Sequence, residues 1–291
     1  MLQHVFKGNR SDMHIFKPIR GIRLEDLKAT ASVRVSLVNS STGETKIILP
    51  LAPARMYMEL GSWGEGFYRQ TVRVNGDSVI TGYIAVSGTG VSLDNDKYIS
   101  VDVVDNILSS PGNPDEYLTK LYGIETSSIP QRYLYSVQRM FLPVGELQKR
   151  FGLSGSEQLV VPIRSVGSNG LPDPVAGSNG LESLQLSTTS GISPIYRPEE
   201  LDQLIDESND VVMKFYSPGN DATLNVPATY CVLDLSGVTA VDVTLVSGSP
   251  AFELWKVDIR DSAMPDVPLP SNIRDNAMQE ITIPAEPQVT I

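Results

Sequence analysis

Cysteine and histidine are almost absent from this chain of 291 residues. Cys231 is the only cysteine, so no internal disulfide can form, and we expect its thiol to serve as a small apolar side chain in a buried strand. The two histidines, His4 and His14, both lie near the N-terminus. A Ser-His-Asp or Cys-His mechanism needs an imidazole inside the fold. Such catalysis is therefore excluded from the body of the protein, and a histidine-based zinc or iron site is nearly excluded.

The sequence also lacks long apolar runs and phosphate-binding loops. No stretch approaches the roughly 20 apolar residues that span a bilayer, and the first residues lack the apolar run of a signal peptide. The GxxxxGK[ST] pattern of nucleotide-binding loops is missing. We therefore expect a protein made in a reducing cytoplasm, not an enzyme, with no cofactor and no small-molecule substrate.

Basic residues are scarce over most of the chain. The formal net charge is −11, which argues against a surface that coats nucleic acid. The first 30 residues are the exception, and we predict that residues 1–30 form a basic arm in front of an acidic body. This arm is either a solvated terminus or a contact for an acidic partner surface. Its basic residues are Lys7, Arg10, Lys17, Arg20, Arg23 and Lys28.

What the sequence does contain is a pattern of short β-strands, clearest over residues 230–259. Val241, Val243 and Leu245 alternate with polar residues, and this period of two predicts one buried and one open face. We predict three consecutive strands here, paired as an antiparallel meander. The last of them, around Trp255, is apolar on both sides, which is typical of a strand covered on both faces.

Similar patterns occur along the whole chain and give about fifteen short strands in two groups. All-β domains with strands at this spacing are sandwiches or barrels, and eight strands per unit is typical of a jelly roll. We therefore predict an all-β protein of two tandem antiparallel β-sandwiches, most simply jelly rolls, with a few short helices in the connections. One of the predicted strands covers residues 54–60. Helices are predicted over residues 21–31, 115–122, 143–152 and 197–208.

The predicted domain organisation has four parts. Residues 31–127 form the first sandwich and residues 128–260 the second. Beyond them, residues 261–291 contain five prolines, which exclude a helix and disfavour central strands, so we expect an extended tail. Within the second sandwich the pentapeptide GSNGL occurs twice, at residues 167–171 and 177–181, and we predict an exposed loop there.

Two segments carry candidate ligand residues. The glycine-rich stretch 61–66 contains Trp63 and is followed by Phe67 and Tyr68. These aromatic side chains could stack on sugar faces, or could instead pack onto the end of their own sandwich. Asp94 and Asp96 offer oxygen ligands for calcium, although an Asx turn is the simpler interpretation of this segment. Paired carboxylates for glycoside hydrolysis cannot be singled out among 34 acidic residues.

In its organisation the chain resembles the major capsid proteins of icosahedral viruses and tailless phages that are built from two successive jelly rolls. The resemblance covers roughly residues 30–260 and lies in the strand count, the helices within long connections and the flanking arms. It implies a shell subunit that forms trimers or higher oligomers, contacts other virion proteins, and directs its arm toward membrane or genome. The protein would then be assembled in the host cytoplasm and located in the virion.

Two other functions stay open at this stage. A carbohydrate-binding, receptor-binding or adhesion module would use the loop from Trp63 to Tyr68. A glycoside hydrolase would use a carboxylate pair that the sequence does not identify.

Overall fold

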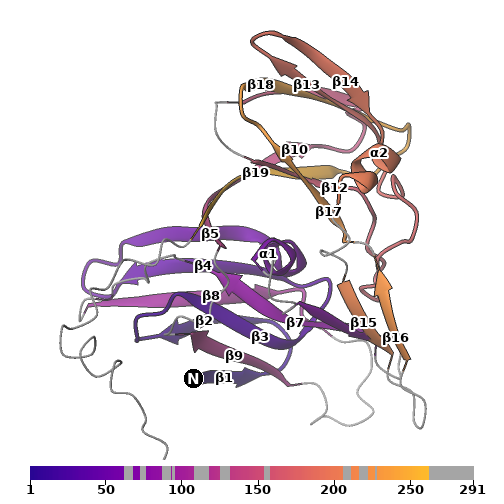
Figure 1. Cartoon of the computed structure of the whole chain (residues 1–291). Helices are drawn as coiled ribbons and strands as arrows, with labels where there is room; N and C mark the ends of the chain where they lie inside the picture. Colours follow the sequence, from indigo (N-terminus) through magenta and orange to yellow (C-terminus); the bar gives the residue numbers. More distant parts are fainter. Residues whose placement is uncertain are drawn as a thin grey trace, which may run out of the picture.

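The structure is a computed structural model that describes residues 1–61, 68–72, 77–86, 93, 96–107, 118–124, 132–153, 158–205, 211–215, 222–226 and 228–261. In these residues nearly all of the regular structure is β-strand, and the strands form four sheets with two short helices beside them (Figure 1). The predicted all-β class is therefore confirmed. Neither helix of the described part is long and apolar enough to cross a membrane.

The N-terminal part of the chain forms a sandwich of eight strands in two sheets. These strands are β1 (Leu2–Phe6), β2 (Arg10–Ile15), β3 (Gly21–Lys28), β4 (Ser32–Asn39), β5 (Thr45–Pro53), β7 (Ser78–Ala85), β8 (Lys97–Val104) and β9 (Thr119–Ile124). One sheet has the order β1-β9-β3-β7, and the other has the order β2-β8-β4-β5. Side chains from both sheets, such as Leu24 and Val101, meet in one core and are fully buried.

The C-terminal part forms a second sandwich of eight strands. They are β10 (Arg132–Leu142), β11 (Gln148–Gly152), β12 (Gln158–Pro162), β13 (Leu181–Thr188), β14 (Gly191–Tyr196), β17 (Tyr230–Asp234), β18 (Val238–Leu245) and β19 (Phe252–Asp261). Their sheets have the orders β10-β19-β12-β17 and β11-β18-β13-β14. In Figure 1 this sandwich lies above the first one.

The two sandwiches have the same strand order. Counted within each sandwich, one sheet contains the first, eighth, third and sixth strands, and the other contains the second, seventh, fourth and fifth. Neighbouring strands of these eight-stranded units pair antiparallel throughout. Such a double sheet of eight strands is a jelly roll. The prediction of two jelly rolls in tandem is confirmed.

The connection between the fifth and sixth strands carries extra structure in both jelly rolls. In the first it contains helix α1 (Ala54–Gly61) and strand β6 (Arg69–Val72), and in the second it contains helix α2 (Pro198–Gln203) and the hairpin β15 (Val211–Phe215) and β16 (Ala222–Val226). Strand β6 pairs with β7, and β15 pairs parallel to β6. The hairpin of the second jelly roll therefore extends a sheet of the first (Figure 1).

The central strands β12 and β19 of the sheet β10-β19-β12-β17 carry apolar side chains that are buried on both faces. In β12, Leu159 and Val161 point into the core of the second jelly roll, whereas Val160 between them packs into the core of the first. In β19, Leu254 and Trp255 divide between the two cores in the same way. A strand covered on both faces was predicted around Trp255, and this is confirmed. The two jelly rolls therefore share an apolar layer.

The meander predicted over residues 230–259 is correct in its three strands and wrong in their pairing. Val241 and Val243 of β18 are fully buried, as their alternation predicts. Strands β17 and β19, however, belong to one sheet and β18 to the other, so that consecutive strands cross between the layers. Such crossing is inherent in the jelly-roll strand order, and local periodicity cannot reveal it.

Three of the predicted local structures are wrong because a bulge, a turn or complete burial obscures the periodicity. The predicted helix over 21–31 is strand β3, in which a bulge between Leu24 and Leu27 shifts the alternation by one residue. The predicted helix over 143–152 is a turn at Gly145, which has φ +90, followed by β11. The predicted strand over 54–60 is helix α1, in which residues 54–60 are all buried, including the charged Arg55 and Glu59.

The other two predicted helices have different outcomes. The helix predicted over residues 197–208 is confirmed as α2, which ends at Gln203. Of the helix predicted over 115–122, residues 119–122 are part of strand β9, and residues 115–117 lie outside the described residues.

The basic arm predicted over residues 1–30 is not a separate arm. These residues contain β1, β2 and β3, which pair with β9, β8 and β7 inside the first jelly roll. The first jelly roll therefore begins at Leu2 and not at residue 31. The predicted tail over residues 261–291 lies outside the described residues, apart from Asp261 at the end of β19.

The shared apolar layer gives a first prediction. We expect Trp255→Ala to lower the free energy of unfolding by about 3–5 kcal/mol, because a buried aromatic side chain is replaced by a cavity between the jelly rolls. The measurement is urea denaturation followed by circular dichroism. Val246→Ala is the control, since Val246 is 50% exposed and its loss should cost no more than about 0.5 kcal/mol. Equal effects of the two substitutions would contradict the prediction.

Candidate functional site

Helix α1 carries two charged side chains into the junction between the two jelly rolls. Arg55 and Glu59 are 1% and 5% exposed, and the distance from Arg55 Nη1 to Glu59 Oε1 is 3.8 Å. Their separation of four residues places them on one side of the helix. A buried charge is costly unless it is paired and hydrogen-bonded. The partners of these two side chains therefore indicate what the helix does.

The guanidinium group of Arg55 bridges the two jelly rolls. Its Nη2 donates to Gln70 Oε1 of β6 at 2.9 Å and to the carbonyl oxygen of Gly170 at 2.7 Å. Its Nη1 donates to Thr229 Oγ1 at 3.3 Å. Gln70 belongs to the first jelly roll, whereas Gly170 and Thr229 belong to the second. One planar cation thus fixes three acceptors from both units.

Glu59 completes this junction from the same helix. Its carboxylate accepts a hydrogen bond from the backbone N–H of Thr229 at 3.0 Å. Burial raises the pKa of Glu59 to about 7, although Arg55 and the hydrogen bonds from residues 229 and 230 act in the opposite direction. Burial also raises the pKa of the neighbouring phenols Tyr68 and Tyr230. Tyr230 packs edge-on against Trp255, with 5.9 Å between the ring centroids.

The first GSNGL pentapeptide supplies the Gly170 carbonyl. Gly170 N–H donates to the Gly167 carbonyl at 2.8 Å, and Asn169 Oδ1 accepts from the Leu171 N–H at 3.1 Å. Gly170 has φ +81, and a Cβ there would lie 2.5 Å from the Cβ of Ala29, so only glycine fits this turn against the first jelly roll. The expected exposed loop is therefore wrong at Gly170, which is buried in the junction.

The second pentapeptide repeats the same turn at a different place. Gly180 N–H donates to Gly177 at 2.9 Å, and Asn179 Oδ1 accepts from the Leu181 N–H at 3.3 Å. This copy packs against Ser249, not against the first jelly roll. The ten-residue repeat in the sequence is thus a repeated turn, of which one copy serves the junction.

A second buried arginine ties helix α2 to the same segment. Arg164 donates through Nη1 to the carbonyl oxygen of Ala228 at 3.0 Å, and its Nη2 forms an ion pair with Asp202 of α2. Ala228 is the neighbour of Thr229, to which α1 is bonded. Both helices, which occupy equivalent connections, are therefore attached to residues 228–229.

This junction is closed to solvent, which decides what it can do. Gln70 and Ser78 are fully buried, and Thr229 is 1% exposed. A substrate has no access to Arg55 or Glu59, so these groups hold the jelly rolls together and do not face a ligand. Among the described residues, no group of three or more His, Cys, Asp or Glu side chains is arranged to hold a metal ion.

Five basic residues of the predicted arm, which the capsid resemblance directs toward membrane or genome, lie at separate places in the structure. Lys7 and Arg10 lie at the beginning of β2, whereas Lys17 and Arg20 follow its end. A strand of this length spans about 20 Å. Arg23 lies on β3 of the opposite sheet and pairs with Glu25. The residues therefore do not form one basic surface.

The other candidate residues have different outcomes. Trp63, Phe67 and Asp94 lie outside the described residues. Tyr68 is 6% exposed and packs in the core of the first jelly roll, so its ring cannot stack on a sugar. Asp96 lies in an exposed turn, where its backbone carbonyl accepts the Ser40 N–H at 2.7 Å. The predicted Asx turn involves residues 94 and 95, which lie outside the described residues.

Sequence reasoning missed the junction itself. The spacing of Arg55 and Glu59 within ARMYMELG was available as a signal, since a cation and an anion four residues apart favour a helix. Nothing in the sequence indicates that Gly170 and Thr229, more than a hundred residues away, supply their partners. Contacts of this kind follow only from the tertiary arrangement.

Comparison with known proteins does not place the chain in a family. No family model and no curated protein matches it. Similar solved structures include the oxalate decarboxylase of Bacillus subtilis, with 10% identity, a TM-score of 0.22, and coverage of 94% of this chain and 74% of that one. The PBSX exported protein XepA has 8% identity, a TM-score of 0.19, and coverage of 89% and 86%. TM-scores this low indicate neither a shared fold nor a shared function.

The raised pKa of Glu59 gives a second prediction, for Glu59→Gln. The carboxyl titrates at 4.5 when unfolded and at about 7 when folded, so the folded state binds the proton more tightly. Its stabilising effect is complete below pH 4.5 and is lost as the pH rises through 7. The free energy of unfolding of the parent protein should therefore fall, relative to the variant, by on the order of 3 kcal/mol across this interval. Denaturation curves across this pH range that stay parallel for the two proteins would refute the assignment.

The Arg55 contacts give a third prediction. We expect Arg55→Met to cost about 3–5 kcal/mol of stability, because Glu59 loses its cation and the buried acceptors on Gln70, Gly170 and Thr229 lose their donor. Arg139→Met is the matched control, since Arg139 and its partner Glu253 are 51% and 33% exposed and such a pair contributes at most about 1 kcal/mol. Thermal or urea unfolding measures both. A cost for Arg55→Met no larger than that of the control would show that the junction does not depend on the guanidinium group.

Proposed function

We propose that this protein is a structural subunit of a virus or phage particle, and specifically a shell subunit that assembles with copies of itself. The observation that carries the proposal is the architecture. Two jelly rolls with identical strand order share an apolar layer and are locked by the Arg55 and Glu59 junction. Two successive jelly rolls are also what the resemblance to capsid proteins implies, and this agreement supports the proposal.

Jelly rolls also occur in lectins and enzymes, so the fold alone does not decide the function. The use of the buried charged groups supports a mechanical role. Arg55, Glu59 and Arg164 are directed into contacts within the chain, where they fix the jelly rolls and the two helices. A shell subunit must keep its shape when neighbouring subunits press on it, and buried contacts of this kind make the subunit rigid.

The exposed apolar side chains of the second jelly roll also support assembly. Val175, Ile192, Ile195 and Val246 are between 50% and 70% exposed. Val175, Ile195 and Val246 line one hollow, and exposed apolar side chains that are grouped in this way often mark a surface that contacts another protein. In the proposal these contacts are made with further copies, as trimers or higher oligomers, and with other virion proteins.

A direct test is to follow the purified protein over a range of concentrations by analytical ultracentrifugation and by negative-stain electron microscopy. We expect trimers or larger closed assemblies to form as the concentration increases, because self-association follows mass action. Electron microscopy of the native particle should find the protein in the shell. A monodisperse monomer at every concentration would contradict the proposal.

A further inference from the structure

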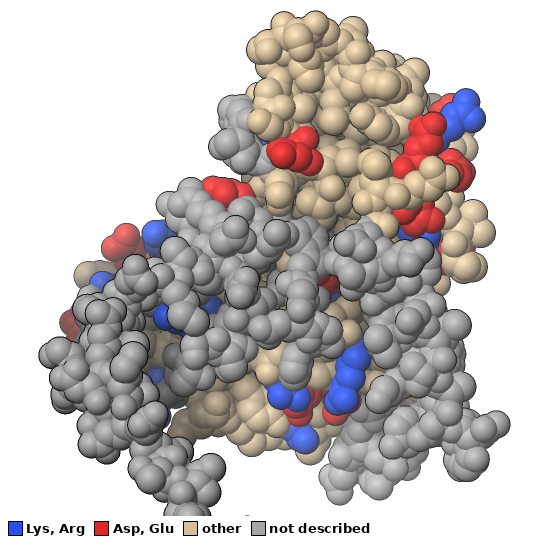
Figure 2. Space-filling view, in the orientation of Figure 1, with Lys and Arg blue, Asp and Glu red and all other residues tan. Residues whose placement is uncertain are grey.

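The outer face of the sheet β11-β18-β13-β14 carries almost no uncompensated charge. Arg150 of β11 pairs with Asp242 of β18 at 2.8 Å and also donates to Ser187 Oγ at 3.1 Å, so this ion pair is satisfied within the face. Gln185 and Thr244 occupy neighbouring outward positions. Figure 2 shows the upper part of the second jelly roll largely free of Lys, Arg, Asp and Glu. The face is therefore polar, but close to neutral.

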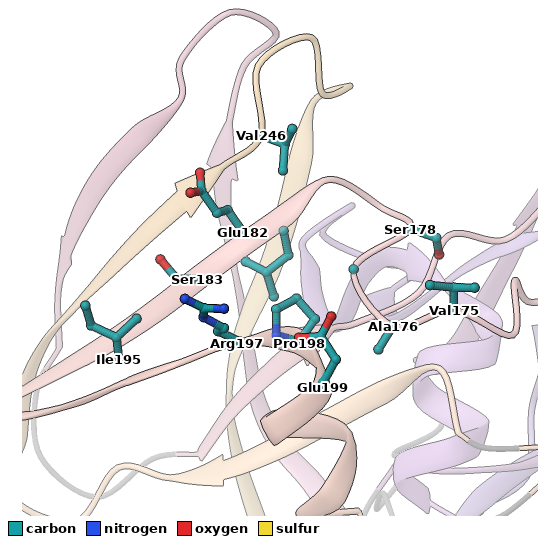
Figure 3. A pocket seen from close by; sticks show the side chains of 12 residues that line it. Val175, Ala176, Ser178, Glu182, Ser183, Ile195, Arg197, Pro198, Glu199 and Val246 are labelled. Atoms are coloured by element: carbon teal, nitrogen blue, oxygen red, sulfur yellow. The ribbon is translucent and has the colours of Figure 1, made fainter.

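Two apolar features lie at separate places on this face. Ile192, just after the turn between β13 and β14, is 70% exposed and forms a protrusion. An open hollow of about 610 Å³ begins at Ile195, three residues farther along β14, and reaches Val246 after β18 (Figure 3). Its apolar lining comprises Val175, Leu181, Ile195, Pro198 and Val246.

Ile192 is close in sequence to Ile195 at the near wall of the hollow, but it is too far from Val246 at the opposite wall to meet it within one chain. Ile192 lies opposite Ser187, which lies opposite Ala240 of β18. Val246 follows Ala240 by six residues, which corresponds to about 20 Å along a strand. A contact between Ile192 and Val246 therefore requires two molecules.

The edge of this sheet is unsuited to pairing with an additional strand. Strand β14 contains Pro194, which has no backbone N–H, and its pairing with β13 is interrupted by a bulge between Gln185 and Ser187. Prolines and bulges at sheet edges prevent strand addition. Contacts at this edge must then be made by side chains.

The charge of the chain indicates which partner fits. At −11, two copies repel each other over most of their surfaces, and the repulsion is smallest where the local charge is neutral. Nucleic acid needs clustered cations, which this face does not offer. The hollow is also lined by the charged side chains of Glu182, Arg197 and Glu199 (Figure 3). Thr189 and Ser190 beside Ile192 are exposed and uncharged. The protrusion thus brings hydroxyl groups, and no further charge, to a lining that holds one more acid than base.

We propose that Ile192 of one copy inserts into the hollow beside Val246 of the next copy. A protrusion and a hollow at different places give a heterologous contact, in which each copy uses one of its two features toward each neighbour. Repetition of such a contact closes a ring if the rotation between copies allows it, as in a trimer. The inference rests on the proposed self-assembly and specifies the surface through which it occurs.

Charge substitutions test the surface. Ile192→Lys and Val246→Glu should each weaken self-association at least tenfold in analytical ultracentrifugation, because a charge would be buried in an apolar contact. Ile47→Lys is the matched control, since Ile47 on β5 of the first jelly roll is 55% exposed and should leave the association unchanged. Association that survives both substitutions, or that is lost equally in the control, would overturn the inference.

Cysteine cross-linking tests the pairing itself. The only native cysteine, Cys231, is 1% exposed, so introduced thiols react selectively. We expect a mixture of Ile192→Cys and Val246→Cys proteins to form a disulfide-linked dimer under oxidation by diamide, and neither protein alone to do so. A dimer formed by Ile192→Cys alone would show a symmetric contact and overturn the inference. The absence of any cross-link in protein that still assembles would overturn it as well, while leaving the proposed function intact; a parent protein that never assembles would overturn both.

Discussion

The position of one jelly roll on the other depends on the buried guanidinium group of Arg55. An apolar layer such as that around Val160 and Trp255 favours contact but tolerates sliding, because the hydrophobic effect has no direction. A buried guanidinium is different, since each of its N–H groups needs an acceptor in a fixed direction. Gly170 and Thr229 can serve as acceptors in only one arrangement of the two units. Burial of the apolar layer thus holds the two jelly rolls together, and the hydrogen bonds of Arg55 fix their relative position.

The internal repetition of the fold explains where this junction lies. Both jelly rolls extend the same connection, between their fifth and sixth strands, and both extensions contain a helix. Helix α1 reaches residue 229 through Glu59, and helix α2 reaches residue 228 through Arg164. A third link, the pairing of β15 with β6, joins the two extensions directly. The extended connections of the two jelly rolls therefore meet at the junction and join the two jelly rolls.

How far the sequence predicts this structure depends on how regular each element is. Strand β18 was predictable because Val241 and Val243 keep a strict period of two. In β3 the bulge near Asp26, with φ +56, changes the spacing to resemble a helix. In α1 the spacing of Arg55 and Glu59 is helical, but the residues between them are apolar and buried, as in a central strand. The charges of residues 1–30 suggested a free arm because outward-facing strand residues and solvated coil have the same composition. The candidate junction was not predictable, since its partners are distant in sequence.

The division between inner and outer charges connects the fold to the proposed assembly. A shell subunit must be stiff within itself and able to approach its own copies. In this chain Arg55, Glu59 and Arg164 are buried where charge gives directional contacts, while the outer face near Ile192 and Val246 is left nearly neutral in a protein of charge −11. Directional contacts are needed once, when the jelly rolls fold together, and there the buried charges find hydrogen-bond partners on both units. Contacts between copies must form repeatedly and in register, and an apolar protrusion and hollow allow this without bringing like charges together.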